Sequence, residues 1–96
     1  MKVLVSCANG AGTSLMMKMK VEQAFKELGI DLTEIKHCSI SEGKSQARNY
    51  DAVFCSQNFT NMFDSAKQQG TKVIGMKNIL SVEEAKEKIK AEGLCD

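Results

Sequence analysis

The first 28 residues, MKVLVSCANGAGTSLMMKMKVEQAFKEL (1–28), contain an apolar run, a glycine-rich loop and an amphipathic segment, in that order. The run Val3-Leu4-Val5 predicts a buried strand over residues 2–6. After the loop, apolar residues recur at helical spacing and predict a helix from about Thr13 to Leu28. The core face of this helix is predicted to hold Met17, Val21, Ala24, Phe25 and Leu28.

The loop between this strand and this helix has the composition of an anion-binding loop. Gly10 and Gly12 let the backbone turn tightly, and Thr13 or Ser14 can cap the helix that follows. Backbone N–H groups and the positive end of the helix dipole then point into one small concavity, which suits a dianionic phosphate. The predicted phosphate-binding residues are Ala8, Asn9, Gly10, Ala11, Gly12, Thr13 and Ser14.

Cys7 lies at the edge of this loop and is the candidate nucleophile. Unpaired N–H donors at a helix N-terminus stabilise a thiolate, and a thiolate that faces an oxyanion cradle is suited to covalent catalysis. The alternative interpretation is a buried cysteine at the end of a strand, followed by an ordinary strand-to-helix loop.

Length and composition limit the class of protein. The 96 residues are expected to form one domain, 1–96. The 13 Lys and Arg residues nearly balance the 12 Asp and Glu residues, so a nucleic-acid partner is not expected. The sequence shows neither a charged and then apolar leader nor an apolar stretch of about 20 residues, which favours a cytoplasmic protein.

The cysteines and the histidine show no metal-ligand pattern. Cys7, Cys38, Cys55 and Cys95 form no Cys-x-x-Cys pair, and His37 has no metal partner at helical spacing, so we expect neither a metal nor a cofactor. Cys38 and Cys55 are expected to be small apolar residues in strands, and Cys95 an inert residue near the C-terminus. His37 is expected to be a surface or edge histidine rather than a catalytic base.

The rest of the chain alternates strands and helices. Further strands are predicted at residues 31–38, 51–55 and 73–76. Helices are predicted at 41–48, where the segment is short or irregular, at 59–66, and after Ser81, which begins a capping box. Short connections favour right-handed βαβ units, and so a Rossmann-like α/β fold with a doubly wound, open four-stranded parallel sheet of order 2-1-3-4 and helices on both faces. This order places Cys7 at the carboxyl end of a central strand, where such sheets bind ligands.

Three large apolar side chains, Leu15, Met16 and Met19, lie off the core face of the first helix. Exposed methionines beside a site predict a docking surface that accepts more than one partner. The alternative is that the first turn tucks under another loop, or that these are scattered exposed apolar residues.

The motif Cys7-x-Asn9-Gly10-x-Gly12-Thr13-Ser14 after an N-terminal strand resembles the IIB component of a bacterial phosphotransferase sugar-uptake system (PTS). The sequence is most similar to the ascorbate-type IIB proteins. The similarity extends through residues 17–21, Lys44-Ser45 and residues 78–81. Galactitol-, mannitol- and lactose-type IIB proteins also carry a cysteine followed by small and hydroxyl residues.

This resemblance implies a phosphoryl carrier. Cys7 accepts a phosphoryl group from a phosphohistidine on a IIA protein or domain and transfers it to a sugar, for the ascorbate type L-ascorbate, that is imported by the membrane permease IIC. The resemblance thus implies a phosphotransferase that associates peripherally with its permease. The chemistry agrees, because phosphoryl transfer needs an in-line nucleophile and neutralisation of the equatorial oxygens.

Two other functions fit a cysteine-led phosphate loop. A low-molecular-weight cysteine phosphatase or arsenate reductase places an arginine six residues after the nucleophile to grip the phosphate, whereas this sequence has Thr13 at that position. A non-catalytic anion-sensing module would bind phosphate without a covalent adduct. The carrier is favoured, because without that arginine a phosphocysteine should persist until an acceptor arrives.

Overall fold

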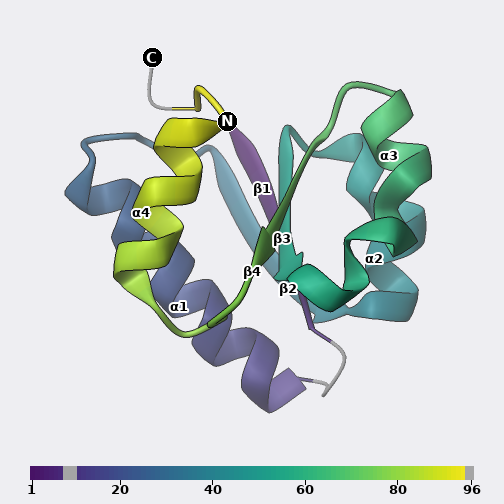
Figure 1. Cartoon of the computed structure of the whole chain (residues 1–96), viewed down its shortest axis with the longest axis horizontal. Coiled ribbons are helices and arrows are strands. Elements are labelled where there is room, and N and C mark those ends of the chain that lie inside the picture. Colours follow the sequence, from purple (N-terminus) through teal and green to yellow (C-terminus); the bar gives the residue numbers. More distant parts are fainter. Residues whose placement is uncertain (8–10, 95–96) are drawn as a thin grey trace.

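The computed structural model of the chain describes residues 1–7 and 11–94. Its centre is a four-stranded parallel sheet of order β2-β1-β3-β4, which confirms the predicted order (Figure 1). The strands are β1 (Lys2–Cys7), β2 (Glu34–Ser39), β3 (Ala52–Ser56) and β4 (Lys72–Met76). The connection from β1 to β2 places β2 on one side of β1, and the connection from β2 to β3 crosses back over β1. Strand β1 therefore lies between β2 and β3.

Helices cover both faces of this sheet. In Figure 1, α1 and α4 lie side by side on one face, and α2 and α3 lie on the other. The helices are α1 (Ala11–Glu27), α2 (Ile40–Gln46), α3 (Asp64–Gln68) and α4 (Val82–Ala91), with 3-10 helices η1 (Ala47–Asn49) and η2 (Gln57–Phe63). The α/β class with helices on both faces is therefore confirmed.

The face under α1 and α4 holds the larger core. Its centre is Phe25, whose ring packs edge-on against Phe54 with centroids 5.8 Å apart. The predicted stripe of α1 is confirmed, since Met17, Val21, Ala24 and Phe25 have no exposed surface and Leu28 packs partly buried beside them. Burial of a large apolar side chain contributes roughly 1.5–3 kcal/mol, so this stripe fixes α1 against β1.

The opposite face is built around β3 and η2. Ala52 to Cys55 are fully buried, as predicted for a central strand. The prediction of a single helix at 59–66 was wrong for its first half, because residues up to Phe63 belong to the 3-10 helix η2. Phe63, the last residue of η2, and Ala66 of α3 are buried, whereas Met62, predicted on the buried face, is 38% exposed.

The boundaries differ from the sequence predictions at several ends. Helix α1 begins at Ala11 rather than Thr13, and β2 begins at Glu34 rather than at residue 31. The Ser81 cap of α4 is confirmed, because its Oγ accepts a hydrogen bond from Glu84 N at 3.1 Å. The reciprocal half of the predicted capping box was wrong, because the Ser81 N–H donates to Asn78 O. The Glu84 carboxylate instead accepts from the backbone N–H of Lys77 and Asn78 at 2.6 and 2.8 Å and holds the segment before the helix.

Candidate functional site

Cys7 is the last residue of β1, at the carboxyl edge of the sheet between β2 and β3. This is the predicted position, at the crevice where parallel α/β sheets bind ligands. Side chains alternate along a strand, so the Cys7 side chain shares the α1 face with Val3 and Val5. Cys7 is 6% exposed, and its partner in the register of β2 is Ser39.

The first turn of α1 follows Cys7 after three residues. Ala8, Asn9 and Gly10 lie outside the described residues, and of Ala11 and Gly12 the structure describes only the backbone. Because α1 begins at Ala11, Thr13 and Ser14 lie within its first turn, and the prediction that one of them caps the helix was wrong. The N–H groups of a first turn have no partner inside the helix, so this turn offers donors and a positive dipole end at the edge where Cys7 lies.

Ser14 and His37 form a partly buried contact that the sequence analysis did not predict. Ser14 has no exposed surface, and its Oγ lies 3.0 Å from His37 Nδ1. His37 lies on the edge strand β2, as predicted, but its ring is half-buried and faces α1. The signal in the sequence was the alternation of side chains along β2, which places His37 on the same face as Ile35 but does not show which residue of α1 it meets.

On the opposite face, Ser6 fixes the ends of β1 and β2 to each other. Its buried Oγ donates to Ser39 O at 2.8 Å and lies 3.8 Å from Cys38 Sγ. Ser39 Oγ in turn accepts from Glu42 N and caps α2. A hydrogen bond therefore joins the residue before Cys7 to the residue that is paired with Cys7 on β2.

Cys38 and Cys55 are buried in strands, as predicted. Burial raises the pKa of the Cys38 thiol, and it raises the pKa of the Cys55 thiol from 9.0 to about 12. Both therefore stay protonated at neutral pH and serve as small apolar residues. Cys95 lies outside the described residues.

Leu15, Met16 and Met19 are 44%, 51% and 60% exposed, which confirms their predicted exposure on α1. We call these three residues the α1 patch. A shallow hollow of about 260 Å³, lined by Met16, Met19, Lys20 and Gln23, extends from it along the helix. An apolar surface of this kind, with flexible methionines, suits contact with another protein.

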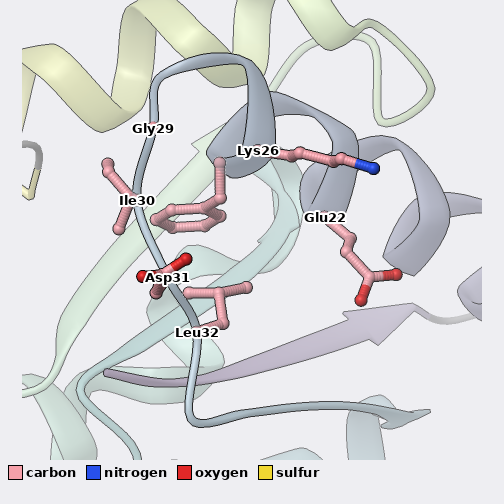
Figure 2. Close-up of a pocket in the computed structure, with 7 residues that line it drawn as sticks. Glu22, Lys26, Gly29, Ile30, Asp31 and Leu32 are labelled. Carbon is pink, nitrogen blue, oxygen red and sulfur yellow. The ribbon is translucent and has the colours of Figure 1, made fainter.

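A second hollow lies at the other end of α1, as Figure 2 shows. It has a volume of about 330 Å³ and is lined by Glu22, Phe25, Lys26, Gly29, Ile30, Asp31 and Leu32. These residues precede β2, so they lie at the amino edge of the sheet, opposite Cys7. This hollow is therefore separate from the candidate site.

Comparison with known proteins identifies the family. Residues 2–91 match the family described as PTS system, Lactose/Cellobiose specific IIB subunit. The chain belongs to the PTS IIB family. It is 37% identical over 81 residues to the ascorbate-specific PTS system EIIB component of Shigella dysenteriae, covering 83% of this chain and 76% of that protein. The corresponding protein of Salmonella typhimurium is 36% identical over the same shares of both chains.

A solved structure supports the IIB fold. The lactose-specific IIB domain from Streptococcus pneumoniae superposes with a TM-score of 0.65, covering 98% of this chain and 95% of that one, at 14% sequence identity. Membership of the family makes the chain a phosphotransferase component of a sugar PTS, which favours the carrier over the phosphatase and the anion-sensing module. Among residues 1–7 and 11–94, no helix has the length and apolarity needed to cross a membrane.

Proposed function

We propose that Cys7 is the phosphoryl-accepting residue of this IIB component. The observation that carries the proposal is its position, at the carboxyl end of a central strand and separated by three residues from the first turn of α1. Of the other cysteines in the described chain, Cys38 and Cys55 lie inside strands and have raised pKa values, so neither offers a thiolate.

The transfer proceeds in two displacements. The Cys7 thiolate attacks the phosphorus of a phosphohistidine on IIA, so that an S–P bond forms as the N–P bond breaks and its electron pair returns to the imidazole ring. The proton lost by the thiol balances the one that this ring takes up. A sugar hydroxyl then attacks the same phosphorus, the S–P electron pair returns to Cys7, and the proton of the hydroxyl re-forms the Cys7 thiol.

The first turn of α1 supports the phosphoryl group. The backbone N–H groups of residues 9–14 are proposed to donate to its oxygens, and Asn9, Thr13 and Ser14 to add side-chain donors. Preorganised donors of this kind stabilise the charge that spreads over the equatorial oxygens. The positive end of the α1 dipole acts in the same direction.

L-ascorbate is the proposed sugar, because the relatives that are 36–37% identical are ascorbate-specific components. The chain would then receive its phosphoryl group from a IIA protein or domain and deliver it at the cytoplasmic face of the permease IIC. The α1 patch, which lies in the first turns after the site, is proposed to contact these partners.

Intact-protein mass spectrometry after incubation with phosphoenolpyruvate, the general PTS proteins and an ascorbate-type IIA tests the carrier role. We expect one added phosphoryl group that requires IIA and is absent from Cys7→Ser, while the matched control Cys95→Ser is labelled fully. Normal labelling of Cys7→Ser, or release of phosphate from an aryl phosphate at enzyme-like rates, would contradict the proposal. Labelling by another type of IIA alone would reassign the sugar.

A charged residue in the α1 patch tests docking. Met19→Glu should slow phosphoryl exchange with IIA without unfolding the domain, because a charge on a 60% exposed apolar residue weakens an apolar contact. Met62→Glu is the matched control, since Met62 is 38% exposed in η2 on the other face of the sheet. Equal rates for the two variants would remove the patch from the proposed interface.

A further inference from the structure

Ser6 is a buried polar residue on the face of β1 that α2 covers. It shares this face with Leu4 by alternation along the strand, and the register pairs it with Cys38 on β2. Leu4 and Cys38 both belong to the apolar cluster of this face. Ser6 has no exposed surface, and a buried hydroxyl is costly unless it is hydrogen-bonded, whereas an alanine would carry no such cost. Packing of the core therefore gives no reason for a serine at this position.

The Ser6 hydroxyl donates to the backbone of β2, and a glycine in α2 makes room for it. Ser6 Oγ lies 2.8 Å from Ser39 O, and a Cβ at Gly43 would overlap this hydroxyl. The φ of Gly43 is not positive, so the backbone of α2 does not itself require a glycine here. Glycine inside a helix and serine in a core are both locally unfavourable, and together they make this hydrogen bond possible. Such departures from local preference are expected at functional sites.

This hydrogen bond lies where the sheet holds β1 on one side. The register of β1 with β3 ends at Val5, whereas its register with β2 continues to Cys7, which pairs with Ser39. Ser39 is itself anchored, because its Oγ accepts from Glu42 N at 3.3 Å and caps α2. The Ser6 hydroxyl therefore adds a side-chain link between β1 and β2 one residue before the candidate nucleophile.

We propose that Ser6 is a positioning residue for phosphoryl transfer, whose bond to Ser39 O fixes the end of β1 and with it the Cys7 side chain. In-line attack requires the sulfur, the phosphorus and the leaving nitrogen to align, and a displacement of about 1 Å can cost about 100-fold in rate. Ser6 is covalently joined to Cys7, so loss of its hydrogen bond acts directly on the backbone of the nucleophile. This inference rests on the proposed phosphorylation of Cys7.

The kinetics of phosphoryl uptake by Ser6→Ala test this role. We expect the maximal rate of uptake from IIA to fall roughly tenfold, less than the cost of a full 1 Å displacement. The KM for IIA should stay within about twofold of the parent value, because alignment of the sulfur acts on the transition state and not on docking. Mass spectrometry of the same samples at long times should show the full adduct on Cys7.

Thr71→Val is the matched control. Thr71 is buried like Ser6, and its Oγ1 lies 3.1 Å from Ala47 O and from Tyr50 O. It directly precedes β4, so it lies at the amino edge of the sheet, opposite Cys7. Rates are compared under conditions in which urea unfolding shows every variant to be folded, and Thr71→Val should keep the parent rate within about twofold. Equal slowing of the two variants would trace the loss to stability and overturn the inference.

Gly43→Ala disturbs the same hydrogen bond without removing the hydroxyl. The new Cβ displaces Ser6 Oγ from its place beside Ser39 O, so we expect a similar fall in the maximal rate. The double variant Ser6→Ala/Gly43→Ala should be as slow as Ser6→Ala and no slower, because both changes act through one link. Additive losses, or a parent rate in Ser6→Ala, overturn this inference alone. Absence of an adduct on the parent protein overturns the proposed function and this inference with it.

Discussion

Replacing Gly43 by alanine tests how closely α2 approaches β1 beside the candidate site. Gly43 is buried in α2, and a Cβ at this position would overlap the Ser6 hydroxyl. It would also lie 3.1 Å from Ser6 Cβ and 3.2 Å from Phe63 Cε1, both tighter than ordinary van der Waals contacts. Because Ser6 precedes Cys7, the substitution presses on the end of the strand that holds the candidate nucleophile.

Two effects of opposite sign decide the stability of Gly43→Ala. Alanine is favoured over glycine inside a helix by roughly 0.5–1 kcal/mol. Against this, the Ser6 hydroxyl must rotate away from Ser39 O, its acceptor at 2.8 Å, and an unsatisfied buried hydroxyl costs about 1–3 kcal/mol. The tight contacts with Ser6 Cβ and Phe63 add a cost of about 1–3 kcal/mol if the core does not relax. The sum of these ranges is a net loss of roughly 1–5 kcal/mol in the free energy of unfolding, with the lower values expected if the core relaxes.

Urea unfolding of a double-mutant cycle measures this balance. In Ser6→Ala/Gly43→Ala no hydroxyl remains to be left unsatisfied, so the pair should be about 1 kcal/mol more stable than the sum of the single changes predicts. The control is Ser41→Ala, because Ser41 is exposed in the same helix. Its free energy of unfolding should stay within about 0.5 kcal/mol of that of the parent protein. A Gly43→Ala protein as stable as the parent, or a cycle with no coupling, would refute the close approach.

Three further outcomes follow from buried groups and caps. Because burial raises the pKa of Cys55 from 9.0 to about 12, the folded state keeps a proton that the unfolded state loses. The free energy of unfolding should therefore fall as the pH rises through that range, and it should fall less steeply in Cys55→Ala. An equal slope in both proteins would contradict the raised pKa of Cys55. Thr71 Oγ1 lies 3.1 Å from Ala47 O and from Tyr50 O. Thr71→Val should lower the free energy of unfolding in urea by about 1–2 kcal/mol, and Thr71→Ser should lower it less. Equal losses in the two variants would show that the hydroxyl does not contribute to stability. Ser81→Ala should lose about 1 kcal/mol of thermal stability at the α4 cap, whereas Ser81→Asp retains it; a similar loss in both argues against the cap.

The fold was predictable because its signals are local. Continuous apolar runs at residues 3–5 and 52–55 indicated strands buried on both faces, and the helical period of residues 17–28 indicated one face of α1. The 3-10 geometry of η2 was not predictable, because residues 59–66 fit both helical periods and packing decides between them. Gly75 of β4 shows this packing, since a Cβ there would lie 2.9 Å from Gln57 Cα.

The candidate site was predictable only along β1 and the loop that follows it. Cys7 could be placed because a strand, a loop and a helix are consecutive in the sequence. The Ser14–His37 contact joins residues 23 apart, and it exists because the register pairs Val5 with His37. Alternation in the sequence indicates which residues share a face but not which rung of the neighbouring strand they meet, so this contact required the structure.

The position of the arginine bears on whether a phosphocysteine at this site would persist. The chain has one arginine, Arg48, which is exposed in η1. The segment η1 precedes β3, so Arg48 lies at the amino edge of the sheet, whereas Cys7 ends β1 at the carboxyl edge. A guanidinium that grips the phosphate of a phosphocysteine lowers the barrier to its attack by water. The Arg48 guanidinium therefore cannot reach a phosphoryl group on Cys7 of the same chain. Backbone donors in the first turn of α1 can hold that phosphoryl group, but no guanidinium of this chain assists its hydrolysis. The distance between Arg48 and Cys7 thus favours a phosphocysteine that persists until an acceptor binds, as the proposed carrier requires.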